Sequence, residues 1–357
     1  MPMIKNGATI RDVAKLAGTS PATVSRVMRD EGYPVTEQLR QRVREAVETL
    51  QYEARPVKLA SPTSTPAKML CNTIGVLLPN TSNPFYQQAM LGIERVAQSK
   101  GYFVFVCNTM RDINREAEYL KAMYRQGIHN VVLSPVSNDS TNILSYRDKG
   151  MNFVLLEQKL EGLEASRIHF DMFKGAVIAT NYLLNNGHRR IALATTPLTR
   201  WTRMQVFNGY RAALGQVSIE LDKKLVFISS DEEEEIVEEG YDFRAGSELG
   251  SMLAEHIGEF TGIVCVNDIT AAGVMSALKK ARISVPQDVS LVSFDDIALA
   301  SMLLPALTTV RFPTYDAGML AANLMVDLME GITRFPMTMK LEPTLIIRDT
   351  VQSIELV

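Results

Sequence analysis

Hydroxyl and guanidinium side chains gather in one short string, SPATVSRVMR, near the N-terminus. Hydroxyls and backbone N–H groups hold phosphate oxygens, and an arginine can fork onto the edge of a guanine. Such a string on a small exposed helix therefore favours the major groove of DNA. The candidate contact residues are Ser20, Pro21, Ala22, Thr23, Ser25, Arg26 and Arg29. Pro21 and Ala22 offer no side-chain hydrogen bond, so direct readout of bases falls to the others.

The elements that position this string are predicted to be two short helices joined by a tight turn. Thr9 is the expected N-cap of the first helix, and Gly18 supplies the backbone freedom that a sharp turn requires. Ser20 can cap the second helix, with Pro21 at its first position, where an N–H is not needed. Thr36 is the expected cap of a third helix. The apolar positions at helical spacing are Ile10, Val13, Ala14, Ala17, Val24 and Val27.

The whole string TIRDVAKLAGTSPATVSRV, residues 9–27, resembles the N-terminal headpiece of the lactose-repressor (LacI/GalR) family. Helical periodicity alone would leave open a generic surface hairpin of two helices. The resemblance implies a helix-turn-helix module that docks on DNA, and it adds Thr9 to the candidate contacts.

The segment after the headpiece departs from the family pattern. Family members form a hinge helix here, whose leucine wedges into the minor groove. In this sequence Ala54-Arg55 replaces the usual Pro-Asn, and prolines at 56 and 62 bracket the candidate wedge, Leu59. We expect a Pro-rich linker over residues 53–70 in which a hinge helix is one of two open alternatives.

Composition and charge limit the classes of protein to which this chain can belong. The chain has 357 residues, 46% of them apolar, and a net charge of −3. Residues 1–60 carry ten Lys/Arg against seven Asp/Glu, and the remaining residues carry 27 against 33. A basic N-terminal part joined to an acidic remainder fits a nucleic-acid module attached to a ligand-binding module.

The sequence holds no targeting or metal-binding signal. The opening MPMIKNG is not followed by an apolar stretch, and no apolar run reaches the roughly 18 residues of a membrane span. The cysteines Cys71, Cys107 and Cys265 have no CxxC spacing, and the four histidines are scattered. We expect a cytoplasmic protein with reduced, buried thiols, no metal and no cofactor.

From residue 72 onward the pattern alternates between strands and helices, which is typical of parallel sheets covered on both faces. The expected strands are 72–78, 102–107, 130–134, 152–157, 168–170, 190–195, 224–228, 262–266, 290–294 and 308–312, with a strand region around 338–348. The alternation runs through two similar α/β halves. Two halves predict a cleft between lobes, with a ligand beyond the carboxyl ends of the strands.

Several strings extend the family resemblance through this part of the chain: GHRRI (187–191), VND (266–268), VPQDVSL (285–291), FDD (294–296), PALTTV (305–310) and LIIR (345–348). The resemblance implies a two-lobed, periplasmic-binding-protein-like α/β core behind the all-α headpiece. It places the headpiece at 1–52, the linker at 53–70 and the effector-binding and dimerisation core at 71–357. The N-lobe would hold about 71–171 and 313–336, and the C-lobe about 172–312 and 337–357.

The resemblance also implies a set of effector-binding residues in the cleft. Sugar-like ligands need charged groups that fork onto hydroxyls and aromatic rings that cover C–H faces. The candidates are Asn80, Ser82, Phe85, Tyr86, Asp171, Arg200, Thr202, Tyr241, Asp268 and Asp295. Asp295 stands where the family has its main polyol- or base-binding carboxylate, with a helix N-cap as the alternative. Structural roles are equally open for Asp171 and Asp268, and either aromatic of the first loop could be core.

One position departs from the family set. Many members carry an arginine three residues before a Gly-aromatic pair, but here Val206 precedes Gly209-Tyr210. Arg203 could replace that arginine from one turn away.

We therefore expect a transcriptional repressor that binds a near-palindromic operator as a homodimer and responds to a sugar or sugar derivative. A nucleoside- or purine-type corepressor is the alternative effector. An enzyme is disfavoured because the chain has no GxGxxG after a strand, no GxxxxGK[ST] and no GxSxG. A secreted solute-binding protein is disfavoured by the headpiece.

Overall fold

The structure, a computed structural model, describes residues 9–29, 36–50, 72–158, 160–230, 240–333 and 335–354. The side chains of Arg11, Ala22, Ser25, Arg26 and Arg29 are outside this description. The linker predicted at 53–70, with its candidate wedge Leu59, also lies outside the described residues. The chain divides into two compact units, Met1–Pro66 and Ala67–Val357.

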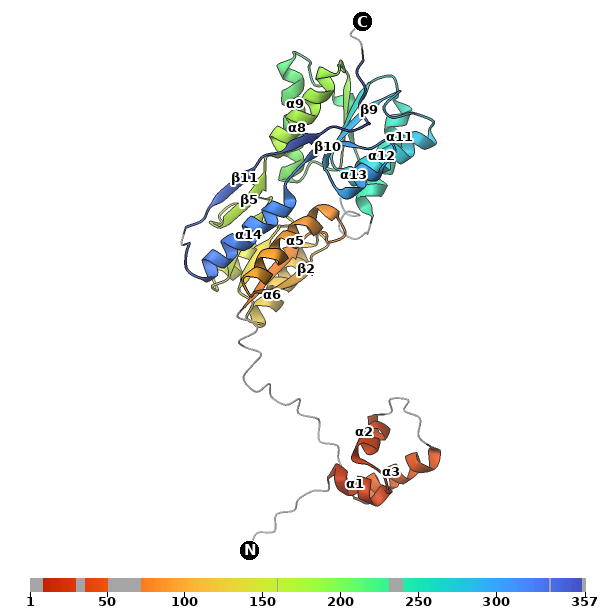
Figure 1. The fold of residues 1–357 in the computed structure, drawn as a ribbon, viewed down its shortest axis with the longest axis vertical. Helices are drawn as coiled ribbons and strands as arrows, with labels where there is room; N and C mark the ends of the chain where they lie inside the picture. The colour runs from red at the N-terminus through yellow and green to blue at the C-terminus, as the bar shows by residue number, and fades with distance from the viewer. Residues whose placement is uncertain are drawn as a thin grey trace. The chain divides into compact units, whose positions relative to one another are not determined.

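The described part of the first unit consists of α1 (Ile10–Ala17), α2 (Pro21–Arg29) and α3 (Glu37–Thr49), coloured red to orange in Figure 1. The three helices close a small apolar core, as the sequence predicts. Its buried residues are Val13, Ala14, Ala17, Val24, Val27, Val43 and Ala46.

Local hydrogen bonds begin and end these helices at the predicted residues. The backbone N–H and the hydroxyl of Thr9 both donate to Asp12, at 2.8 and 2.6 Å. Gly18 ends α1 with φ of 63°, a left-handed conformation that glycine adopts without steric cost. The N–H of Thr23 donates to Oγ of Ser20 at 3.1 Å, which caps α2. The helix-turn-helix therefore follows from local sequence alone.

The second unit is built on two six-stranded sheets. The first has the order β11-β5-β4-β3-β1-β2, and the second has the order β12-β10-β9-β8-β6-β7. The strands of the first are β1 (Thr73–Leu78), β2 (Phe103–Asn108), β3 (Asn130–Leu133), β4 (Asn152–Leu156), β5 (Ser166–Phe170) and β11 (Thr338–Leu341). Those of the second are β6 (Ile191–Thr195), β7 (Val226–Ile228), β8 (Gly262–Cys265), β9 (Ser290–Asp295), β10 (Thr308–Arg311) and β12 (Thr344–Ile346).

Every pairing within these sheets is parallel except that of β10 with β12. We call the part around the first sheet the N-lobe and the part around the second sheet the C-lobe. Parallel strands require crossover helices, and these cover both faces of each sheet.

The N-lobe helices are α5 (Pro84–Ser99), α6 (Ile113–Arg125), α7 (Thr141–Arg147) and α14 (Thr314–Met329). The C-lobe helices are α8 (Met172–Asn185), α9 (Trp201–Gln216), the 3₁₀ turn η1 (Lys223–Leu225), α11 (Tyr241–Glu255), α12 (Asp268–Lys280) and α13 (Ala298–Met302). Figure 1 shows α14, in blue, alongside α5, in orange, although the two are far apart in sequence. No described helix is long and apolar enough to cross a membrane.

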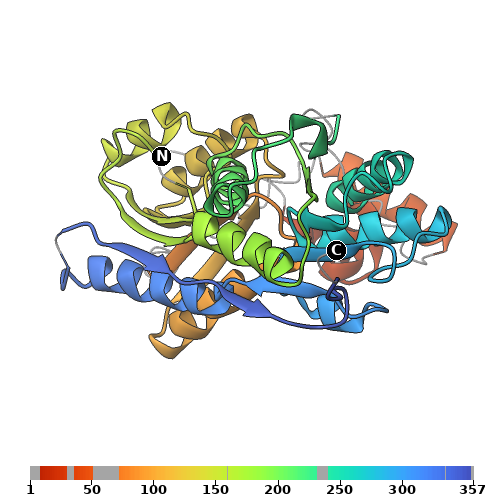
Figure 2. The same ribbon diagram turned by 90° about the horizontal axis from the view of Figure 1, so that it is seen from above.

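The chain passes between the lobes at three places. It leaves the N-lobe after β5, returns after β10, and leaves again between β11 and β12. The third passage differs from the expected boundary near 336, because β11 pairs in parallel with β5 and so belongs to the N-lobe sheet. Figure 2 shows this blue segment running from one lobe to the other. Hydrogen bonding to β5, a contact between segments far apart in sequence, decides the placement.

Candidate functional site

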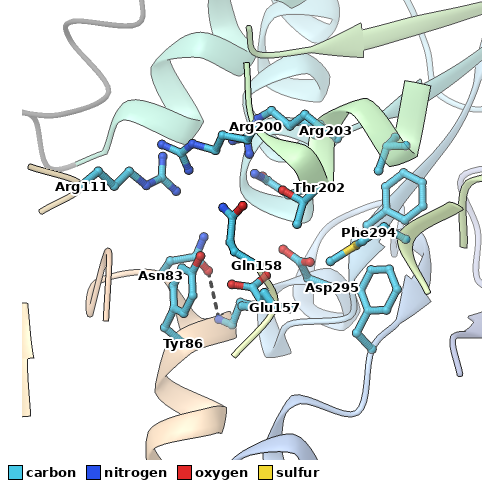
Figure 3. Close-up of a pocket in the computed structure, with 16 residues that line it drawn as sticks. Asn83, Tyr86, Arg111, Glu157, Gln158, Arg200, Thr202, Arg203, Phe294 and Asp295 are labelled. Carbon is cyan, nitrogen blue, oxygen red and sulfur yellow. Dashed lines mark hydrogen bonds between the residues drawn. The ribbon is translucent and has the colours of Figure 1, made fainter. Parts of the chain in front are cut away.

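A cavity of about 70 Å³ lies between the lobes, at the carboxyl ends of their strands (Figure 3). The N-lobe contributes Asn83, Phe85, Tyr86, Arg111, Glu157 and Gln158. The C-lobe and its crossing segments contribute Met172, Arg200, Thr202, Arg203, Val206, Val266, Asn267, Phe294, Asp295 and Phe312. We call it the inner cavity. It has room for about five to seven waters, which a small sugar would displace.

Aromatic rings form a continuous series on one side of the inner cavity. The Phe85 ring lies 5.6 Å from that of Phe170 on β5, and the Phe170 ring lies 5.4 Å from that of Phe312. Phe312 in turn stacks on Phe294 at the end of β9, at 6.3 Å. The series joins both lobes and offers apolar faces to a ligand, while polar groups occupy the other walls.

Three charged residues of the cavity have left-handed backbone conformations. Arg111, Glu157 and Asp295 have φ values of 59°, 63° and 107°. Each follows or ends a strand: β2, β4 and β9. Such conformations are unfavourable for residues with a Cβ and persist where the surrounding fold imposes them, often at binding sites. Here they turn three charged side chains from the sheet edges into one cavity.

Glu157 is a buried carboxyl group with several partners. It accepts hydrogen bonds from the Tyr86 hydroxyl and from Oγ of Ser134, the latter at 3.2 Å. Burial raises the pKa of Glu157, and these hydrogen bonds and the nearby Arg200 and Arg111 oppose that rise. Burial likewise raises the pKa of Tyr86, so its hydroxyl stays a donor.

Asp295 is the second carboxyl group of the cavity. Burial raises the pKa of Asp295 well above its usual value, and the negative charges of Asp268, Glu157 and Asp242 raise it further. The positive charge of Arg203 opposes that rise. Nε of Arg203 itself donates to Oγ1 of Thr196. The polar wall therefore combines two carboxyl groups with three arginines.

The two lobes are also joined directly beside the cavity. Nδ2 of Asn83, on the N-lobe, donates to Oδ2 of Asp242 on α11 at 3.3 Å. Nδ2 of Asn267, at the start of α12, donates to Oδ1 of the same carboxylate at 3.4 Å. Only the bond from Asn83 crosses between the lobes, because Asn267 and Asp242 both belong to the C-lobe. Asn83 and Asn267 also line the cavity.

Five of the predicted effector residues meet in this cavity: Phe85, Tyr86, Arg200, Thr202 and Asp295. Neither Asp295 nor Asp296 caps a helix, since Ile297 is the N-cap of α13. Arg203, the suggested substitute for the arginine missing at Val206, lines the cavity as well.

Two predicted carboxylates have structural partners instead of a place in the lining. Asp268 is fully buried, and its carboxylate accepts from Ser293, Thr309 and the backbone N–H of Ile297. Asp171 caps α8 by accepting from the Lys174 N–H at 2.9 Å. The Asp171 carboxylate also pairs with Nζ of Lys340 on β11 at 2.7 Å. Both carboxylates are occupied by these partners, and neither residue lines the cavity.

Three further candidates lie elsewhere. Oδ1 of Asn80 accepts from the N–H of Ser82 within their own loop, and Ser82 is exposed. The neighbouring Asn83 lines the cavity instead and caps α5, accepting from the Phe85 N–H at 2.9 Å. Tyr241 is buried as the first residue of α11.

The prediction missed the residues that the left-handed turns bring in, above all Arg111 and Glu157, and their neighbours Gln158 and Asn267. A signal was available, because each of these positions ends or follows a predicted strand. The position of a residue at the carboxyl end of a strand predicts that it lies at the edge of the sheet that binds ligands. It does not predict whether the side chain points into the cavity.

The headpiece offers a second candidate site. The hydroxyls of Ser20 and Thr23 lie 2.9 Å apart, so one donates to the other, and Pro21 is exposed beside them. Thr9 is exposed at the start of α1, with its hydroxyl donating to Asp12. The remaining candidates on α2, namely Ala22, Ser25, Arg26 and Arg29, have side chains outside the described part.

Within the described residues, no three His, Cys, Asp or Glu side chains group as ligands for a metal ion. Cys107 and Cys265 are buried free thiols, as predicted, and Cys71 lies outside the description.

Both parts of the chain are similar to known protein families. Residues 9–54 match the model described as "Bacterial regulatory proteins, lacI family", and residues 180–351 match a periplasmic binding protein-like domain. The chain is 32% identical over 324 residues to the HTH-type transcriptional regulator RegA of Clostridium saccharobutylicum, covering 90% of this chain and 92% of RegA.

Over 346 residues it is 30% identical to the ribose operon repressor of Escherichia coli strain K12, covering 96% and 99% of the two chains. A solved structure described as a "transcriptional regulator CelR-cellobiose complex" has the same fold, with a TM-score of 0.70 at 24% identity over 96% of this chain and 99% of that one. These relatives are transcriptional regulators and not enzymes, in agreement with the sequence prediction.

Proposed function

This chain belongs to the lacI family of bacterial regulatory proteins and is a DNA-binding transcriptional regulator, and from that premise we propose that it represses transcription under the control of a small molecule bound between its lobes. Residues 1–52 form the DNA-binding headpiece, 53–70 the linker and 71–357 the effector-binding core. The observation that carries the proposal is the inner cavity, which takes charged and aromatic side chains from both lobes.

A ligand held by both lobes changes the balance between lobe arrangements. Arg111 and Glu157 come from the N-lobe, and Arg200 and Asp295 come from the C-lobe, so a ligand that contacts all of them binds the closed arrangement better. The equilibrium moves by the difference in affinity for the two arrangements. The N-lobe continues into the linker, so lobe closure alters how two headpieces are spaced on an operator.

The chemistry of the cavity suits a sugar or sugar derivative. Carboxyl groups and guanidinium groups fork onto vicinal hydroxyls, and the rings of Phe85, Phe294 and Phe312 can cover C–H faces. The descriptions of two relatives name ribose and cellobiose. A purine or nucleoside corepressor is the alternative, and it would use the same rings for stacking.

We propose that the chain acts as a cytoplasmic homodimer. β2 is an edge strand of the N-lobe sheet and carries exposed apolar side chains, with Phe103 55% and Phe105 49% exposed. An exposed apolar edge strand is a surface that a second chain covers. Two headpieces related by two-fold symmetry then read two half-sites.

The test is an anisotropy titration of labelled operator, selected from random-sequence DNA, with and without candidate effectors. We expect steep salt dependence, since phosphate contacts dominate affinity, and loss of specific binding in the double variant Thr23→Ala, Arg26→Ala. Asp295→Ala is expected to bind operator normally but to lose the response to effector. DNA binding that survives the double variant, or an unchanged response in Asp295→Ala, contradicts the proposal.

A further inference from the structure

A second, larger cavity of about 490 Å³ adjoins the inner one, and we call it the outer cavity. The two cavities share three lining residues, Arg111, Gln158 and Arg200. The outer cavity is seven times as large as the inner one, at about 490 against about 70 Å³. A ligand with one ring in the inner cavity therefore has space to continue past the shared residues into the outer one.

Gln158 carries a buried amide at the junction of the two cavities. Its backbone is fixed just after β4, where its N–H donates to the carbonyl oxygen of Leu156 at 2.8 Å. The residue is 7% exposed, and its side-chain amide makes no hydrogen bond within the described residues. Figure 3 shows this amide pointing into the space between the side chains of the two lobes. Buried polar groups find a partner in the protein, in water or in a ligand, so this amide is available to a bound molecule.

The amide of Gln158 favours a partner that both donates and accepts hydrogen bonds. Its nitrogen donates, its oxygen accepts, and the group has no charge to attract an ion. A hydroxyl meets both requirements, because it too donates and accepts. The junction of the cavities therefore suits a sugar hydroxyl that lies beside a glycosidic bond.

The outer cavity has polar walls and, among the described residues that line it, no aromatic ring. Its amide and hydroxyl side chains, apart from Gln158, are Asn114, Ser137, Asn138 and Thr199. The inner cavity has instead the rings of Phe85, Phe294 and Phe312. A flat base gains most from aromatic faces, so the outer cavity suits a unit rich in hydroxyls, and the inner cavity suits a ring with C–H faces.

Hydrogen bonds fix the N-lobe walls of the outer cavity before any ligand binds. The Asp112 carboxylate accepts from the Asn114 N–H at 2.7 Å, and Oγ of Ser137 accepts from the Asp139 N–H at 3.0 Å. Walls that are already ordered lose little entropy on binding. Thr199 belongs to the C-lobe, so a unit in the outer cavity is also enclosed by both lobes. Its binding therefore adds to the preference for the closed arrangement.

We propose that the effector consists of two sugar units joined by a glycosidic bond, one in the inner cavity and one in the outer cavity, with the Gln158 amide hydrogen-bonded to a hydroxyl beside that bond. The inference rests on the proposed function and narrows its effector from sugars in general to disaccharides. It makes Gln158 a specificity-determining residue, because its amide stands where the second unit begins.

The first experiment is calorimetry of the full-length chain with matched ligands. The single sugars are glucose, galactose, fructose and xylose, and the disaccharides built from them are maltose, cellobiose, lactose, sucrose and xylobiose. We expect at least one disaccharide to bind about tenfold or more tightly than either of its component sugars. Single sugars that bind as tightly as their disaccharides, or a panel in which no disaccharide binds, overturn the inference. Inosine or guanosine binding more tightly than every disaccharide also overturns it.

The second experiment repeats the titrations of the tightest disaccharide and its component sugars with variants. Gln158→Met keeps the length of the side chain without the amide, and it should weaken the disaccharide about tenfold while affecting the component sugars much less. Asn138→Trp, at an exposed position of the outer cavity, should weaken the disaccharide by filling the space of the second unit. The matched control Gln88→Met, exposed on α5 and outside both cavities, should change neither affinity.

Melting temperatures check that each variant is folded, and the two cavity variants test the site independently. Disaccharide affinity that is unchanged in both variants, or that falls no more than the affinity for the component sugars, overturns the inference. Operator titrations separate this inference from the proposed function. Single sugars that bind as tightly as disaccharides and alter operator binding overturn this inference alone. A disaccharide that depends on Gln158 but leaves operator binding unchanged contradicts the proposed function alone.

Discussion

Burial raises the pKa of several carboxyl groups in this chain, and Glu116 is the clearest single case. This residue of α6 is 1% exposed, and its Oε2 accepts from the Val136 N–H at 3.1 Å. Burial raises the pKa of Glu116 to about 7, and the hydrogen bond from Val136 lowers it only in part. Val136 lines the outer cavity of about 490 Å³, which shares Arg111, Gln158 and Arg200 with the inner cavity, so this carboxyl group supports a wall beside the site.

A pH-dependent stability follows. The pKa of Glu116 is higher in the folded chain than in the unfolded one, so its contribution is complete below about pH 4.5 and is lost as the pH rises through about 7. Glu116→Gln keeps an acceptor for Val136 but cannot ionise. We expect it to raise the free energy of unfolding at pH 8 by about 1–3 kcal/mol and to change it little at pH 4.

Urea unfolding at the two pH values, followed by circular dichroism, measures the difference between the variant and the wild type. The exposed Glu118→Gln on the same helix is the matched control, and it should leave stability unchanged at both pH values. An equal shift of Glu116→Gln at pH 4 and pH 8 would assign the effect to packing instead of ionisation.

At the scale of elements, glycines allow pairs of helices to touch backbone to backbone. A Cβ on Gly92 of α5 would lie 2.1 Å from the carbonyl oxygen of Tyr315 on α14. In return, a Cβ on Gly318 of α14 would lie 2.0 Å from the carbonyl oxygen of Ala89. These reciprocal contacts tie α14, which returns from the C-lobe, to the first helix of the N-lobe.

We expect Gly318→Ala to lower the free energy of unfolding by about 1–3 kcal/mol, because backbone atoms must move apart. Gly215→Ala near the end of α9 is the matched control, since a Cβ there would meet nothing. It should raise stability by about 0.5–1 kcal/mol through helix propensity. Chemical denaturation of both variants is the measurement, and equal effects would refute the close-contact explanation.

At the scale of the whole molecule, the Asp242 carboxylate of the C-lobe joins the lobes by accepting from Asn83 of the N-lobe, and it also accepts from Asn267 of its own lobe. Asp242→Ala removes the acceptor for both amides, and a hydrogen bond to a charged group contributes about 1.5–3 kcal/mol. We expect a more open core, seen as a larger radius of gyration in X-ray scattering, and effector binding weakened by about tenfold or more.

The exposed Asp148→Ala at the end of α7, far in sequence from these groups, is the control for this experiment and should change neither quantity. A radius of gyration unchanged in Asp242→Ala would mean that other contacts hold the lobes closed.

The sequence by itself determined the local elements and the family. The capped helices of the headpiece begin at Thr9 and Ser20 and turn at Gly18 because caps and left-handed glycines depend only on residues a few positions apart. The alternation of strands and helices could also be predicted from the sequence, since hydrophobic periodicity depends only on neighbouring residues. The family resemblance also indicated Asp295 and Arg200, and both line the inner cavity.

Only the tertiary structure decided which side chains face the cavity. Asp268 and Asp295 both stand at strand or helix ends, yet hydroxyls from β9 and β10 saturate the first, while a left-handed turn directs the second inward. Arg111 and Glu157 enter by the same kind of turn. β11 belongs to the N-lobe because it pairs with β5, and the paired residues lie about 170 positions apart in the sequence. Side-chain direction and strand partnership depend on contacts distant in sequence, which no local pattern records.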